Sequence, residues 1–248
     1  MPSERFTITL DDGAETVIRH HPRPGTTRLY ISHGNGFAVD GYRVFWEPLL
    51  ADFDVVLFDM RNHGESPSTG ADGHHYQQMA RDLTTVHARV EDRLGKSTAV
   101  GVFHSMSSRA AMKNAVDFGS PYDALVLYDP PSVPPRDHAL YEAMRTFELK
   151  LVSWAAERPE RFGSPDETRA ASAGFDRLDH AVDALTVPTL LVRGRRSDLL
   201  SEEGVADFLG RAPHAEFADV AGAGHMVVGD RNEVFNRAIL GFLERQTG

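Results

Sequence analysis

Short hydrophobic runs separated by longer amphipathic stretches organise most of this sequence. Parallel strands that are covered on both faces read as nearly continuous runs of Val, Ile and Leu, and the later runs have that composition. The runs that predict strands are Phe6–Leu10, Thr16–His20, Arg28–Ser32, Asp54–Phe58, Thr98–Phe103, Ala124–Tyr128, Thr189–Arg193 and Ala215–Val220.

Helical periodicity fills the intervals between several of these runs. One apolar stripe, with spacings of three and four residues, consists of Met79, Leu83, Val86, Val90 and Leu94. Further helices are predicted after Ser105, from about Ser201 to Gly210, and from about Arg231 to Arg245.

Strands that alternate with helices predict an α/β fold, with a mostly parallel sheet of about eight strands flanked by helices. The first two strands are joined by Asp11-Asp12-Gly13, which is a turn signal and predicts an antiparallel hairpin at one edge.

The segment 131–186 breaks this alternation, because it contains no clear strand. Its early prolines cannot continue a helix or a central strand. Hydrophobic side chains then recur at helical spacing, among them Phe147 and Trp154. We expect a helical cap at 131–186, inserted into a core formed by 1–130 and 187–248.

Composition narrows the function classes. The chain has 248 residues, of which 41% are hydrophobic, and a formal net charge of −10, which disfavours a broad nucleic-acid-binding face. It has no cysteine, its 12 histidines show no zinc-binding spacing, and no apolar run approaches the roughly 18 residues of a membrane span. The expectation is a soluble cytoplasmic protein with a small-molecule partner, no metal and no membrane contact; its oligomeric state stays open.

Ser105 stands between a predicted strand and a predicted helix. A serine on such a sharp turn is exposed at the carboxyl edge of the sheet, where its Oγ can reach a substrate. The backbone N–H of Met106 then lies at the helix N-terminus, where negative charge is favoured. The alternative is that Ser105 only caps the helix.

The stretch Ile31–Phe37 follows the third strand and reads I-S-H-G-N-G-F. Two glycines around Asn35 allow the backbone to approach a ligand closely, so its N–H is the second candidate donor to an oxyanion. His33 is expected to brace this loop.

His225 follows the last predicted strand in a loop of small residues and is the candidate general base. Its carboxylate partner is predicted to be Asp198, in the loop after the seventh strand, since Gly194 permits a sharp turn there. The rival is Asp129, at the end of the sixth strand, where two prolines follow at once.

Together these segments resemble the α/β-hydrolase superfamily. The segments H-G-N-G-F, F-H-S-M-S, L-V-R-G-R-R-S-D and G-A-G-H resemble its oxyanion, nucleophile, acid and histidine loops, and D-M-R-N-H-G-E-S resembles a structural stretch of the family. The order Ser, Asp, His also matches. Phe103 and Ser107 depart from the family's pattern, since both replace glycines in the nucleophile turn.

The resemblance implies a serine esterase or lactonase that works through an acyl-enzyme and needs no cofactor. Phe37, Phe147 and Trp154 are the candidate lining of an apolar substrate pocket. The alternatives are a carbon–carbon bond hydrolase, a perhydrolase, or a ligand-binding receptor with slow turnover.

Overall fold

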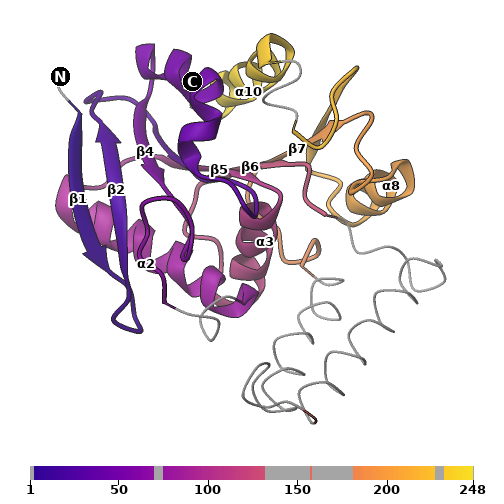
Figure 1. The fold of residues 1–248 in the computed structure, drawn as a ribbon. Helices are drawn as coiled ribbons and strands as arrows, with labels where there is room; N and C mark the ends of the chain where they lie inside the picture. Colours follow the sequence, from indigo (N-terminus) through magenta and orange to yellow (C-terminus); the bar gives the residue numbers. More distant parts are fainter. Residues whose placement is uncertain (1–2, 70–74, 132–156, 158–180, 227–231, 248) are drawn as a thin grey trace.

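An eight-stranded sheet crosses the molecule in the computed structural model, which describes residues 3–69, 75–131, 157, 181–226 and 232–247 (Figure 1). Each predicted run forms a strand, and the ends differ by two residues at most. The strands are β1 (Glu4–Thr9), β2 (Glu15–His21), β3 (Arg28–Ile31), β4 (Asp54–Phe58), β5 (Ala99–His104), β6 (Ala124–Tyr128), β7 (Thr189–Gly194) and β8 (Glu216–Val220).

The strand order is β1-β2-β4-β3-β5-β6-β7-β8. From β4 onward neighbouring strands are parallel, whereas β1 pairs with β2, and β2 with β4, in the antiparallel sense. The predicted edge hairpin is confirmed: Thr9 pairs with Glu15 across the turn, in which Gly13 takes a φ of 85°. That conformation suits glycine because it has no Cβ.

Helices cover both faces of the sheet. One hydrophobic cluster joins it to α2 (Tyr76–Leu94), α3 (Met106–Phe118) and α8 (Glu202–Arg211). The other joins it to α1 (Arg43–Trp46), its flanking 3₁₀ turns η1 (Val39–Tyr42) and η2 (Glu47–Ala51), and α10 (Asn232–Thr247). Adjacent β5 residues face opposite sides: Val102 belongs to the second cluster and Phe103 to the first.

The helices predicted from periodicity are confirmed. Ser201 caps α8, since its Oγ accepts a hydrogen bond from Gly204 N at 3.0 Å. The short helical turns between Val39 and Ala51 escaped prediction. They are single turns interrupted by Gly41 and Pro48, too short to display a helical repeat.

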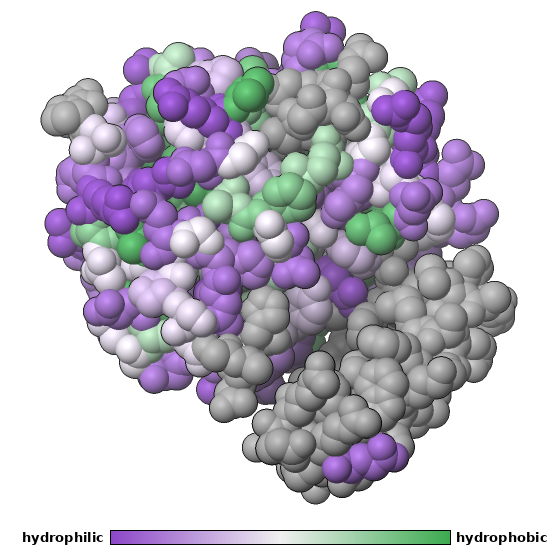
Figure 2. Space-filling model, in the orientation of Figure 1, coloured by the Kyte–Doolittle hydropathy of each residue, from purple (hydrophilic) through white to green (hydrophobic). Residues whose placement is uncertain are grey.

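The carboxyl ends of the parallel strands meet at one edge of the sheet, so the loops after β3, β5, β6, β7 and β8 converge there. The expected cap, including Phe147 and Trp154, lies outside the described residues apart from its two ends and residue 157. Hydrophilic side chains cover most of the described surface in Figure 2. Within the described residues, no helix has both the length and the apolarity needed to cross a bilayer.

Candidate active site

Ser105 occupies the sharp turn between β5 and α3, with a φ of 49° and a ψ of −108°. A positive φ is uncommon for a residue with a Cβ and costs roughly 1–3 kcal/mol, so the surrounding fold must hold it. Ser105 stands at the N-cap of α3, but its side chain makes no capping hydrogen bond. The capping alternative therefore fails, and the side chain of Ser105 is turned to another partner.

The turn tolerates Phe103 because the space for its ring comes from Gly101, two residues earlier on the same face of β5. A Cβ at Gly101 would lie 2.4 Å from Cε2 of Phe103. The ring is fully buried and meets Tyr122 edge-on. Ser107, the other departure from the family pattern, fits because its Oγ donates to the carbonyl of His104 and accepts from the N–H of His104.

His225 is the partner of Ser105. Its Nε2 lies 3.0 Å from Ser105 Oγ, which is hydrogen-bonding distance. The side chain of His225 is 27% exposed, whereas Ser105 is buried. The structure therefore brings together the serine and histidine expected from the sequence, although they are 120 residues apart.

The carboxylate beside His225 belongs to Asp129, which corrects the expectation for Asp198. Oδ2 of Asp129 contacts Nδ1 of His225, the ring nitrogen that faces away from Ser105. Asp198 is exposed to solvent. The carboxylate, the imidazole and the hydroxyl thus form one continuous line of contacts.

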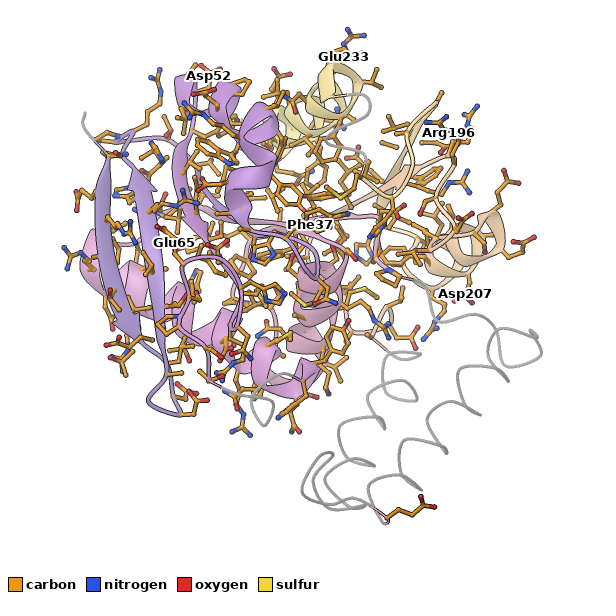
Figure 3. All side chains as sticks on the ribbon, viewed as in Figure 1. Phe37, Asp52, Glu65, Arg196, Asp207 and Glu233 are labelled. Carbon is orange, nitrogen blue, oxygen red and sulfur yellow. The ribbon has the colours of Figure 1, made fainter. Side chains whose placement is uncertain are left out.

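The geometry of the two loops explains this correction. Asp129 has a φ of 46°, a left-handed conformation that Asp tolerates better than most residues. In the loop after β7, the N–H of Ser197 donates to Gly194 O at 2.8 Å. This turn directs Ser197 toward Asp129, whereas Asp198 is exposed. Arg196, from the same loop, lies at the margin of the molecule in Figure 3.

Asp129 is fully buried and held from two directions. Ser197 Oγ donates to its Oδ2 at 2.5 Å, and Gly194 N donates to its Oδ1 at 3.3 Å. These donors come from the loop in which the acid was expected. They satisfy carboxylate oxygens that burial would otherwise leave unpaired.

The loop after β3 forms a tight turn against Ser105. Phe37 N donates to Gly34 O at 3.2 Å, and Gly36, with a φ of 77°, takes the turn position that requires a positive φ. A Cβ at Gly34 would lie 3.2 Å from Cβ of Ser105. The backbone of this loop therefore runs directly beside the serine, as expected for a loop that offers Asn35 N.

Two histidines support this turn. His63 Nε2 accepts from Gly36 N at 3.1 Å and lies 3.2 Å from Oδ1 of Asn35, while its Nδ1 donates to Arg61 O. His33 lies under the loop: its Nδ1 donates to Gly34 O and its Nε2 accepts from Met60 N. Burial lowers the pKa of His33, in keeping with a neutral structural ring.

Phe37 follows the turn and is 42% exposed, with its ring edge-on to Tyr42. It lies near the middle of the view in Figure 3. Of the three aromatic residues expected to line a pocket, it is the only one that the structure describes. Among the described residues, no cluster of side chains suited to hold a metal ion was found.

Gly194→Ala is expected to lower kcat by about tenfold to a hundredfold and to lower the melting temperature. A Cβ at Gly194 would lie 2.0 Å from the backbone oxygen of Gly224, so the loop that carries His225 must shift. Misplacement by about 1 Å can cost about a hundredfold in rate. Steady-state kinetics and thermal unfolding measure both effects.

The matched control is Gly210→Ala on α8, where a Cβ meets nothing within 4 Å. It should keep kcat and hold or raise the melting temperature, since Ala favours a helix over Gly. An unchanged kcat in Gly194→Ala would contradict the close approach of these loops.

Comparison with known proteins agrees with this fold. Residues 29–238 match the sequence model of the alpha/beta hydrolase family, so the chain belongs to that family and is a hydrolase of it. Esterase YbfF of Escherichia coli strain K12 is 26% identical over 95% of this chain and 99% of the esterase. A putative carbamate hydrolase, RutD of Caulobacter vibrioides strain NA1000, is also 26% identical, over 97% of this chain and 98% of its own.

Among solved structures, a thermophilic esterase from Thermogutta terrifontis superimposes with a TM-score of 0.73. It is 20% identical, and the match covers 99% of this chain and all of that esterase. This likeness shows a shared fold.

Proposed function

We propose that the protein is a serine hydrolase that cleaves the carboxylic ester or lactone bond of a small, largely apolar substrate. The observation that carries this proposal is the line of contacts from Asp129 through His225 to Ser105. Ser105 stands in a turn with a positive φ, and its hydroxyl does not cap α3. A hydroxyl beside a base that is itself oriented by a carboxylate is the arrangement of an activated nucleophile.

In the proposed first step, Ser105 Oγ attacks the carbonyl carbon and passes its proton to His225 Nε2. The carbonyl π pair moves to oxygen, and the backbone N–H groups of Asn35 and Met106 hold the resulting oxyanion. The first N–H groups of a helix have no partner within it, so Met106 N can donate to a ligand. Asp129 faces Nδ1 and stabilises the imidazolium.

Collapse of this intermediate breaks the bond to the leaving group, whose oxygen takes the proton from His225 Nε2. A water molecule then gives a proton to His225 and attacks the acyl-enzyme. The second tetrahedral intermediate collapses to release the acid, and the proton returns to Ser105. The chain's own residues carry out every proton transfer in this scheme.

Phe37 supports an apolar substrate portion, because its partly exposed ring adjoins the turn that carries Asn35. The similarity to an esterase supports cleavage of an ester. The similarity to a putative carbamate hydrolase makes a carbamate the second substrate class to test. An oxygen leaving group departs from a tetrahedral intermediate with less protonation than a nitrogen leaving group needs. We therefore propose esters and lactones as the preferred substrates.

The test is a substrate panel of p-nitrophenyl esters, lactones, aryl carbamates and vinylogous diketones. The proposal expects the highest kcat/KM for esters or lactones, and a burst of p-nitrophenol if the acyl-enzyme accumulates. Preferred cleavage of a diketone would instead identify a carbon–carbon bond hydrolase. Tight binding with a single slow turnover would identify a receptor.

A further inference from the structure

His104, the residue before Ser105, is fully buried and lies among the loops of the candidate site. Its Nε2 lies 3.1 Å from the backbone oxygen of His225, and its Nδ1 lies 2.7 Å from the hydroxyl of Tyr42. Tyr42 in turn accepts a hydrogen bond from Gly34 N at 3.0 Å. The scheme of proton transfers above assigns no task to these side chains.

The chemistry of these partners fixes the direction of each hydrogen bond. The carbonyl of His225 can only accept, so His104 must carry its proton on Nε2. Its Nδ1 is then an acceptor, so the Tyr42 hydroxyl donates to it, and the Tyr42 oxygen is free to accept from Gly34 N. The chain of donors runs from Gly34 through Tyr42 and His104 to His225.

Burial keeps both side chains in these states. It lowers the pKa of His104 to about 3, with the electrostatic influence of the neighbouring His225 ring as a further cause, and it raises the pKa of Tyr42 to about 12. The ring of His104 also stacks on Tyr128, at 4.5 Å and 10° between planes. Tyr128 directly precedes Asp129 and accepts a hydrogen bond from Ser105 N.

We propose that His104 is a positioning residue for the general base: its Nε2–H anchors the backbone of His225, and Tyr42 ties the same ring to the turn that carries Asn35. The proposal rests on the proposed function of Ser105 and His225. Asp129 orients the ring of His225 through Nδ1, whereas His104 fixes the backbone from which that ring projects. Both constraints are needed because the side chain of His225 is partly exposed.

Two substitutions distinguish the hydrogen bond that His104 makes through Nε2 from the one that it makes through Nδ1. Glutamine places an amide N–H near the position of Nε2 and can still donate to the His225 carbonyl. Asparagine places an oxygen near the position of Nδ1 and can still accept from Tyr42, but it loses the donor to His225. We expect His104→Asn to lower kcat by about tenfold to a hundredfold, with KM changed by less than about threefold.

His104→Gln should retain at least about one third of the wild-type kcat. The matched control is His87→Asn on α2, because His87 also packs against tyrosine rings, those of Tyr30 and Tyr122, on the other face of the sheet. It should lower the melting temperature without lowering kcat. Equal loss of kcat in His104→Asn and His104→Gln, or no loss in His104→Asn, would overturn the proposal.

A second measurement needs no substitution. In wild-type protein with ¹⁵N-labelled histidine, NMR should show His104 as a neutral ring protonated on Nε2 throughout pH 5–8, a range well above its pKa of about 3. A proton on Nδ1, or a second proton within this range, would overturn the proposal even if the variants fail to fold. This outcome does not depend on whether Ser105 acts as the nucleophile, so the two proposals can fail separately.

Discussion

Asp129→Asn is expected to lower kcat by up to about 10⁴-fold, whereas Asp198→Asn should keep kcat close to that of the wild type. The carboxylate of Asp129 contacts Nδ1 of His225 and is buried, while Asp198 is exposed on the outer side of its loop. Asparagine keeps the shape of the side chain but can present N–H to Nδ1, which favours the wrong tautomer of His225.

The two variants are compared at saturating substrate, with circular dichroism and thermal unfolding to check that each is folded. Asp198→Asn is the matched control, because it makes the same chemical change in a neighbouring loop. A folded Asp198→Asn protein without activity, beside an active Asp129→Asn protein, would show that Asp198 and not Asp129 is the carboxylate partner of His225.

Ser105→Ala should have an even larger effect, with a loss of kcat of up to about 10⁶-fold. Removing the hydroxyl removes the nucleophile, and only substrate binding and the backbone donors remain to assist the reaction. The fold should persist, because Ser105 Oγ makes no capping bond to α3. Kinetics with the purified protein, together with its unfolding curve, measure both expectations.

The control is Ser108→Ala, three residues further along. Ser108 Oγ donates to the backbone oxygen of Phe103 at 2.6 Å, so its loss should cost about 1 kcal/mol of stability. Its kcat should stay within about threefold of the wild type. Near-normal turnover by folded Ser105→Ala would show that another group attacks the substrate.

The fold was predictable because its signals are local. The central strands β4, β5, β6 and β7 are fully buried, mostly hydrophobic runs, whereas β1 and β2 alternate more buried with more exposed residues. The Asp11-Asp12-Gly13 turn marks the antiparallel edge. The positions of Ser105 and His225 followed from the same local order, since Ser105 comes directly after β5 and His225 lies in the loop after β8, at the same edge of the sheet.

The carboxylate was not predictable in this way. The argument for Asp198 compared the freedom of two loops, and it treated the prolines after Asp129 as a restraint on its reach. The choice depends on the positive φ of Asp129, and on where the turn from Gly194 to Ser197 directs its side chains. The support from His104 and Tyr42 is likewise non-local, because it joins residues 62 positions apart.

Covalent labelling tests the central claim most directly. The protein is treated with a fluorophosphonate, and its intact mass and tryptic peptides are measured by mass spectrometry. The account predicts one adduct per chain, on Ser105 within the peptide Ser97–Arg109, where fragment ions separate Ser105 from Ser107 and Ser108. An adduct on another residue, or continued ester hydrolysis by fully treated protein with Ser105 unlabelled, would contradict it.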